Sequence, residues 1–367
     1  MSLCKTPHLG MIRFVAIWLV VTTRLNVLSC ADEKLQKPQS QLPTFKFPGE
    51  SYRGEFAPLS QEEQLVEQQL KVDVRKLAVE IGERHVGRPQ QLAAAAKWIE
   101  EELKAVRFDV ERQTYNVDGV ECSNLIVEMP GSVAPSEIVL IGAHYDSAPG
   151  TPGANDNGSG TAACLALARR RRDFKPDKTL RFVFFVNEEP PHFQKQTMGS
   201  LVYARRCKER REDLVAVLSL ETLGYYSDAD GSQNYPPLLS ASYPSTGNFV
   251  GFVGNLDSKP LVTDVITSFR KHARFPSEAG SLPGQLKGVG WSDHWAFWEF
   301  GYRGVMVTDT APFRYPHYHR ATDAPDKIAY DRLARVTLGL EAVIKDLCRI
   351  IEKPAAPPKL KSIRIKK

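Results

Sequence analysis

The chain has 367 residues, of which 42% are hydrophobic and 25% charged, enough to bury a large core in one enlarged α/β domain. Its formal net charge of +5 comes from its two ends: without three cations in residues 1–31 and six in the tail from Lys353 onward, the body carries −4. This balance excludes a basic nucleic-acid-binding surface, and the run Arg169 to Arg172 predicts a solvated helix end.

Residues 1–31 have the order of an export signal. Two cations precede an apolar stretch at residues 14–21, and small residues follow before the first acid. The apolar stretch is too short for a comfortable membrane span and Arg24 interrupts its continuation, so we expect no stable span in the mature chain. The sequence predicts an exported protein, periplasmic or extracellular. Because residues 28–30 also resemble a lipobox, lipid attachment at Cys30 is the alternative.

Composition divides the rest of the chain into three parts. Residues 32–58 are rich in Gln, Pro and charge, which predicts a linker or a strap over the surface. One large folded domain is expected over residues 59–352, and the basic, proline-rich tail 353–367 is expected to be disordered. The cysteines outside the export signal are too few and scattered for a disulfide framework, and we expect them to be buried apolar residues: Cys122, Cys164, Cys207 and Cys348.

The predicted elements alternate between helices and strands. Apolar spacing predicts helices at 60–81, 90–106, 159–172, 199–210, 258–273 and 293–300. Apolar runs rich in β-branched residues and bounded by turn residues predict strands at 124–130, 137–146, 179–189, 213–221, 249–254 and 302–310. This alternation predicts an α/β fold of three α/β/α layers, in which helices cover both faces of a mixed, mostly parallel central sheet.

Side chains that bind divalent metals directly follow three of the predicted strands. Because the carboxyl ends of such strands meet at one edge of the sheet, we expect these side chains to converge in a pocket there. Carboxylates and imidazoles gathered beside an apolar sheet repel and desolvate one another unless a cation compensates them. Two divalent ions account for the whole set, which consists of His144, Asp146, Asp156, Glu188, Glu189, Glu221 and His319.

Five short segments stand in the order of a known family of peptidases. They are H-x-D from His144, G-x-N-D-N-G-S-G around Asp156, E-E from Glu188, E-x-L-G-Y from Glu221 and Y-H ending at His319. In these segments the chain resembles the zinc-dependent aminopeptidase family with two co-catalytic metals, which also includes glutamate carboxypeptidases and the related glutaminyl cyclases. The resemblance implies a zinc exopeptidase-like fold, peptide substrates and two Zn²⁺ ions per chain.

The resemblance also implies a metal ligand set. In it, Asp156 bridges the two ions, His144 and Glu189 complete one, and Glu221 and His319 complete the other. Zinc accepts imidazole nitrogen and carboxylate oxygen, which fits these residue types. The second-site carboxylate is more often Asp in the family, so Glu221 is one methylene longer than the usual ligand. Other histidines compete for the terminal ligand position: chiefly His317, and also His192 and His294.

The resemblance and the positions of the residues in the sequence predict roles for the remaining polar residues. Glu188 resembles the family's general base, acting on a water shared by the ions. Asp146 lies two residues after His144 on the same strand face and can orient its imidazole. Asp293 matches an acid close to a ligand or to the substrate, or alternatively caps the helix that follows it. One tyrosine is expected to help stabilise the oxyanion, and the sequence leaves three candidates: Tyr225, Tyr226 and Tyr243.

Three functions are compatible with these residues. An exported di-zinc aminopeptidase would hydrolyse the N-terminal peptide bond. A glutaminyl cyclase would use one zinc to cyclise an N-terminal glutamine, and a noncatalytic relative would retain the fold alone. The segment after Glu189 is longer and bulkier than the glycine-rich turn common in the family, so we expect it to wall the substrate pocket and alter substrate preference.

Overall fold

The computed structural model describes residues 46–237 and 239–349. The strands are β1 (Glu111–Val117), β2 (Val120–Met129), β3 (Ala134–His144), β4 (Lys178–Phe185), β5 (Asp213–Glu221), β6 (Val250–Gly254), β7 (Ser277–Ser281) and β8 (Gly304–Thr308). The α-helices are α1 (Gln61–Arg75), α2 (Pro89–Ala105), α3 (Gly160–Arg171), α4 (Gly199–Glu209), α5 (Lys259–His272), α6 (His294–Trp298), α7 (Ala311–Arg314) and α8 (Tyr330–Leu347). Short turns of other helix types are η1 (Lys76–Ile81), η2 (Ala154–Ser159) and η3 (Pro325–Lys327).

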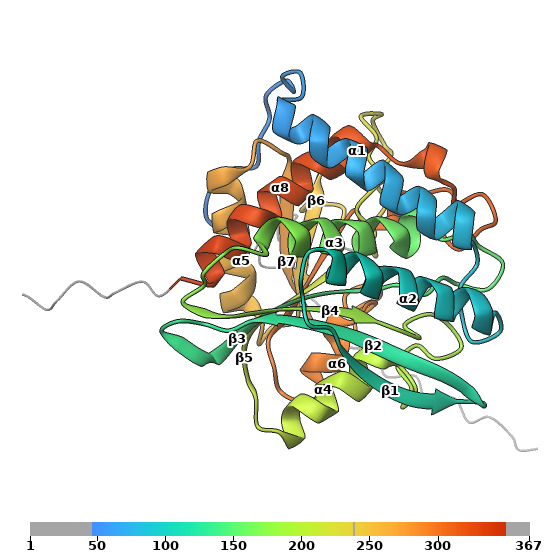
Figure 1. Ribbon diagram of the computed structural model, residues 1–367. Coiled ribbons are helices and arrows are strands. Elements are labelled where there is room, and N and C mark those ends of the chain that lie inside the picture. Colours follow the sequence, from blue (N-terminus) through green and yellow to red (C-terminus); the bar gives the residue numbers. More distant parts are fainter. Residues whose placement is uncertain (1–45, 238, 350–367) are drawn as a thin grey trace, which may run out of the picture. The chain divides into compact units, whose positions relative to one another are not determined.

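The described strands form one mixed sheet in the order β1-β2-β4-β3-β5-β8-β6-β7. Strand β3 pairs in parallel with both β4 and β5, and β5 pairs in parallel with β8. Helices cover both faces of the sheet (Figure 1). A large apolar core joins one face to α1, α2, α3, α5 and α8, and a smaller one joins the other face to α4 and α6. The predicted three-layer α/β/α fold is confirmed.

The central strands are buried on both faces, as parallel strands between two helix layers must be. Residues 179–185 of β4 are all buried, and His144 at the end of β3 stands in register with Phe185 at the end of β4. Glu221 ends β5 in register with Thr308 at the end of β8. The chain therefore leaves these strands at one edge of the sheet, which is where the candidate ligands lie.

Six strands and six helices were predicted from the sequence and occur in the structure, with ends that differ by a few residues. Strands β1 and β7 were not predicted. Strand β1 is largely exposed and polar, and β7 is five residues long without a β-branched residue. Helix α8 was also missed, although its buried positions Leu333, Val336, Leu340 and Val343 have helical spacing and were visible in the sequence.

The arginine run at the end of α3 is not a solvated helix end as predicted. Acids from α1, α2 and α8 form ion pairs with Arg169, Arg170 and Arg171. One of these acids, Asp73, is buried, and its carboxylate contacts the Arg169 guanidinium at 2.5 Å. These cations therefore join helices of one layer to each other instead of facing a ligand.

Residues 46–59 run without helix or strand beside β7 and α5. Phe47 and Phe56 pack against the core, and Arg270 of α5 donates hydrogen bonds to the carbonyl oxygens of Phe47, Pro48 and Gly49. The predicted export signal, Cys30 and the basic tail lie outside the described residues. The four cysteines within the described part of the chain are buried and free, as predicted. No described helix is long and apolar enough to cross a membrane.

Candidate metal centre

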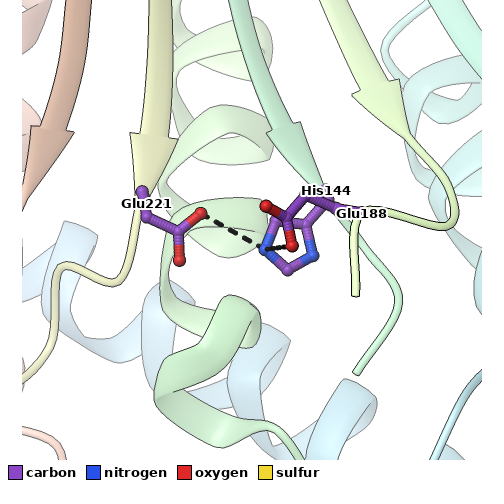
Figure 2. A group of neighbouring side chains, drawn as sticks. All are labelled: His144, Glu188 and Glu221. Atoms are coloured by element: carbon purple, nitrogen blue, oxygen red, sulfur yellow. Dashed lines mark ion pairs between the residues drawn. The ribbon is translucent and has the colours of Figure 1, made fainter. Parts of the chain in front are cut away.

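The candidate ligands come from the ends of three adjacent strands. His144 and Glu221 are the last residues of β3 and β5, and Glu188 follows β4 by three residues. Figure 2 shows the Glu188 and Glu221 carboxylates pointing toward the His144 ring. His144 Nε2 lies 3.3 Å from Glu221 Oε2 and 3.7 Å from Glu188 Oε2. Strand register alone therefore brings these three side chains together.

Asp156 lies between two groups of candidate ligands. Its Oδ1 atom is 3.6 Å from His144 Nε2, and its Oδ2 atom is 3.0 Å from His319 Nε2. His319 Nε2 also lies 3.1 Å from Glu189 Oε2. A single carboxylate thus presents one oxygen to each imidazole, which is the arrangement that a bridging ligand requires.

The grouping of the other ligands differs from the prediction. The sequence analysis placed Glu189 with His144 and Glu221 with His319, whereas the structure places Glu221 with His144 and Glu189 with His319. The ligand atoms of His144, Glu188 and Glu221 lie within 4.8 Å of one another, as do those of Asp156, Glu189 and His319. The loop after β4 carries Glu189 away from the neighbouring strand end and toward the loop of His319.

The buried polar atoms at this site fit metal ions. His144 is fully buried, and neither of its ring nitrogens has a hydrogen-bond partner of normal geometry. Glu189 Oε1 is likewise buried without a partner. Unpaired imidazole and carboxylate atoms are costly to bury in a protein interior, but they are the atoms that zinc binds. The donor set therefore matches two divalent ions held through Asp156.

Electrostatics lead to the same conclusion. Burial raises the pKa of Glu189 to about 8, and the nearby charge of Asp156 acts in the same direction. Burial also raises the pKa of Glu188 well above its usual range and raises that of Glu221. Although burial opposes it, contacts with Asp156 and Glu189 raise the pKa of His319 to about 10. The site as a whole has an excess of acids for which a bound cation would compensate.

Asp146 connects the ends of β3 and β4. Its two carboxylate oxygens accept hydrogen bonds from the backbone N–H groups of Glu188 and Glu189 at 3.2 and 3.1 Å. Its Oδ1 atom lies 3.4 Å from His144 Nδ1, whereas the other ring nitrogen, Nε2, faces Glu188 and Glu221. Asp146 thus holds the backbone of two candidate site residues and stands where it can orient a third.

The longer carboxylate of Glu221 is held by a serine that the sequence analysis did not single out. Ser292 donates a hydrogen bond of 2.7 Å to Glu221 Oε2, and Ser219 lies 3.0 Å from the same hydroxyl. All three residues are buried. The extra methylene of Glu221 is therefore accommodated, with its carboxylate still directed at His144.

The turn that presents Asp156 depends on an acid far along the chain. The Asp323 carboxylate accepts hydrogen bonds from the backbone N–H groups of Asn155 at 2.8 Å and Asp156 at 3.1 Å. Tyr315 donates a further hydrogen bond to Asp323 at 2.7 Å. Asp309 in turn accepts from the Asn155 amide at 2.9 Å. The sequence shows these acids but gives no local sign that they support residue 156.

Arg84 also holds the loop that leads to Asp156, and the sequence analysis did not single it out. It is fully buried and donates hydrogen bonds to the carbonyl oxygens of Tyr145, Pro152 and Gly153 at 2.6, 2.6 and 2.8 Å. Burial lowers the pKa of Arg84 to about 10, while nearby carboxylates, first among them Asp146, oppose the change. Arg84 therefore provides a fixed positive charge behind the acids and fastens the loop between β3 and η2.

The other candidate residues occupy different positions. Asp293 is fully buried, makes no capping hydrogen bond to α6, and neither carboxylate oxygen has a partner. Burial raises its pKa to about 7, while the charge of His144 and the Ser200 hydroxyl oppose the rise. His317 contacts Thr322 and belongs to neither ligand group. The other competing histidines also bond elsewhere in the protein: His192 to Thr197 and His294 to the Val289 carbonyl.

The tyrosine that lies beside the centre was not among those expected. Tyr318 stacks on His319 with ring centroids 3.9 Å apart. Burial and the charges of Asp156 and Glu189 raise the pKa of Tyr318 well above its usual range. By contrast, the Tyr243 hydroxyl donates to the Ala279 carbonyl, and Tyr226 packs against Phe275. Tyr225 packs against Tyr315, whereas Tyr318 lines the same pocket as Glu221.

A pocket of about 780 Å³, which includes space open to solvent, adjoins Glu221 and Tyr318. Its walls are mainly apolar and aromatic. The segment after Glu189 does not line it, contrary to the prediction, and only Gln194 of that segment reaches a second, more polar cavity. The wall opposite the sheet is built from Gln233, Tyr235, Pro236, Leu239, Tyr243, Phe249, Trp291 and Phe313.

An α/β sheet with paired carboxylate and histidine groups at its strand ends, beside a pocket, is typical of a metallopeptidase. The chain belongs to peptidase family M28, whose sequence profile matches residues 124–344. The uncharacterized protein YfbL of Escherichia coli is 33% identical over 282 residues, which cover 74% of this chain and 86% of that protein. The aminopeptidase YwaD of Bacillus subtilis is 34% identical over 119 residues, only 30% of this chain and 25% of that protein.

Solved structures share the fold at low sequence identity. The zinc aminopeptidase BSAP from Bacillus subtilis superposes with a TM-score of 0.62 at 16% identity, covering 77% of this chain and 95% of that one. Glutaminyl cyclases are also among the similar structures. Because identities this low establish the fold alone, the choice between these activities depends on the site of this chain.

Replacement of Arg84 tests the support beneath the centre. We expect Arg84→Met to lower the free energy of unfolding by about 3 kcal/mol or more, because several buried carbonyl oxygens lose their donor. Arg88→Met is the matched control, since the Arg88 guanidinium is more exposed and pairs with Glu83 at 3.3 Å, and the change should cost less than about 1 kcal/mol. Urea unfolding of both variants gives the comparison, and equal losses would contradict this role of Arg84.

Proposed function

We propose that this protein is an exported aminopeptidase that hydrolyses the N-terminal peptide bond of peptides and holds two zinc ions. The observation that carries the proposal is the position of Asp156, whose two oxygens face two separate imidazoles. Membership of a peptidase family supports hydrolysis of peptide bonds. Export is supported by the order of cations, apolar residues and small residues at the start of the sequence.

The residues divide between two sites. His144 and Glu221 would hold one ion with Asp156 Oδ1, and Glu189 and His319 would hold the other with Asp156 Oδ2. When bound, paired zinc ions polarise a carbonyl group and acidify water. Behind them, Asp146 would keep the His144 imidazole in the orientation that directs Nε2 into the site.

Glu188 is the proposed general base. It is buried, its Oε2 atom lies 3.7 Å from His144 Nε2, and burial raises its pKa, which favours uptake of a proton. In the reaction, Glu188 would accept a proton from the attacking water and deliver it to the nitrogen of the leaving amine. The Tyr318 hydroxyl would donate a hydrogen bond to the substrate oxygen as negative charge develops on it.

A glutaminyl cyclase is the second candidate, and similarity to solved cyclase structures supports it. A cyclase needs one zinc ion, for which one ligand group would be sufficient. The second group of Asp156, Glu189 and His319 has its own closely spaced donors, which are enough for a second ion. The complete pair of groups therefore favours hydrolysis over cyclisation, and it equally disfavours a noncatalytic relative.

Removal of the proposed base tests the reaction. We expect Glu188→Gln to lower kcat for aminoacyl amides by about 10²–10⁴-fold, because the amide cannot accept the water proton. Zinc content and the melting temperature should stay at wild-type values. The measurement is hydrolysis of a panel of aminoacyl amides, with and without chelator, alongside the exposed control Glu209→Gln on α4. Nearly full activity of the Glu188 variant would remove this residue from the role of base.

Metal content separates the candidate functions. We expect two equivalents of zinc per chain by atomic emission after dialysis, and a lower count for both Glu221→Ala and His319→Ala, since each removes a ligand of a different ion. One equivalent, together with cyclisation of glutaminyl peptides in place of hydrolysis, would identify a cyclase. Absence of bound zinc from the wild-type chain would contradict both enzymatic functions.

A further inference from the structure

The pocket beside the centre contains one feature that an ordinary apolar pocket lacks. Its floor is the face of the sheet formed by β8, β6 and β7, and the carboxylate of Glu278 on β7 stands at its far end. Glu278 is only partly exposed, and burial raises its pKa. No hydrogen bond or ion pair to this carboxylate is formed by any residue that the structure describes.

Two arginines act on Glu278 through their charge, but neither forms an ion pair or a hydrogen bond with it among the described residues. Arg270 opposes the pKa shift of Glu278 by its charge, but its guanidinium donates to the Ser277 carbonyl at 2.9 Å and to carbonyls of residues 47–49. Arg53 also acts only through its charge. Lys287 lines the pocket, but it is exposed and its ammonium lies 5.8 Å from the centre of the Trp291 ring. A cation entering the pocket would therefore find the Glu278 carboxylate free.

Strand register fixes the backbone separation between Glu278 and Glu221, which belongs to the metal centre. Glu221 pairs with Thr308, Thr308 pairs with Gly251, and Gly251 pairs with Glu278. Three steps between neighbouring strands amount to about 14 Å. Between the two acids the pocket is lined by Thr308 and Gly251, and the Tyr243 hydroxyl and the Leu282 side chain lie over Gly280 on β7.

That distance matches a long basic side chain. An extended lysine or arginine side chain reaches roughly 6–7 Å beyond its Cα atom, and contacts of about 3 Å at each end account for the rest. The methylene stem would lie along apolar walls while the charged end reached the acid. Two stacked tyrosines, Tyr235 and Tyr243, line the same pocket with ring centroids 5.8 Å apart. The Tyr243 hydroxyl donates a hydrogen bond of 3.0 Å to the carbonyl oxygen of Ala279, which follows Glu278 on β7, so Tyr243 lies beside this part of the strand.

We propose that this pocket selects peptides whose N-terminal residue has a long side chain with a cationic end, lysine or arginine, and that Glu278 is the residue that recognises the cation. The inference rests on the proposed aminopeptidase function. A purely aliphatic side chain would pack against the apolar walls of the pocket but would leave the Glu278 carboxylate desolvated without a partner. A site with an unpaired buried polar group discriminates strongly against an analogue that cannot bond to it.

The test compares lysine with norleucine, which has the same four-carbon stem without the amine. With the zinc-loaded full chain, kcat/KM for lysyl p-nitroanilide should exceed that for norleucyl p-nitroanilide at least about tenfold. Glu278→Gln should remove most of that ratio, because the amide keeps the shape but loses the charge. Glu209→Gln, an exposed change of the same kind on α4, should keep the wild-type ratio.

A second measurement does not depend on turnover. Calorimetric titration should show tighter binding of L-lysinamide than of L-norleucinamide to the wild-type chain, with the difference lost in Glu278→Gln at an unchanged melting temperature. Preference for norleucine in both proteins, with hydrolysis intact, would overturn the role of Glu278 while leaving the aminopeptidase function standing. Selective lysinamide binding without hydrolysis of any aminoacyl amide would instead refute the proposed function and retain the cation site.

Discussion

The structure depends on keeping buried acids close together at one edge of a sheet. Glu188, Glu189 and Glu221 all have raised pKa values, because burial and mutual repulsion disfavour their charged forms. A fold tolerates such a cluster only where its backbone fixes the side chains and a cation can balance them. Both conditions are met here, since parallel register aligns the strand ends and Asp156 offers one oxygen to each ligand group.

The support for this cluster is itself polar and buried. Arg84 donates to the loop before Asp156, and Asp323 accepts from the backbone of the turn that contains it. Asp146 likewise fixes the backbone of Glu188 and Glu189. None of these three residues needs to touch a substrate. They restrict the positions of the side chains that would contact the substrate. Replacement of a supporting residue should therefore lower the stability of the fold, and activity should fall as a consequence.

Sequence reasoning recovered what local patterns encode. Apolar runs revealed the central strands, and the residues after those runs identified His144, Glu188 and Glu221 as neighbours. It failed where contacts join residues far apart in the chain: Asp323 lies 167 positions from Asp156, and Arg84 lies 61 from Tyr145. It also grouped the ligands wrongly. The ligand set taken from the family resemblance grouped Glu189 with His144, but the direction of the loop after β4 decides the pairing, and no pattern in the sequence specifies that direction.

Glu221 belongs to the metal centre and to the pocket at once. It begins the row of residues that continues through Thr308 and Gly251 to Glu278, so the spacing between the two ends is set by hydrogen-bonded strands and not by loops. A sheet deforms less readily than a loop, and it therefore holds a recognition group at a fixed distance from the reacting atoms. If Glu278 binds the cationic end of a side chain, the spacing of the strands determines which side-chain length fits. The loops opposite could then vary without changing it.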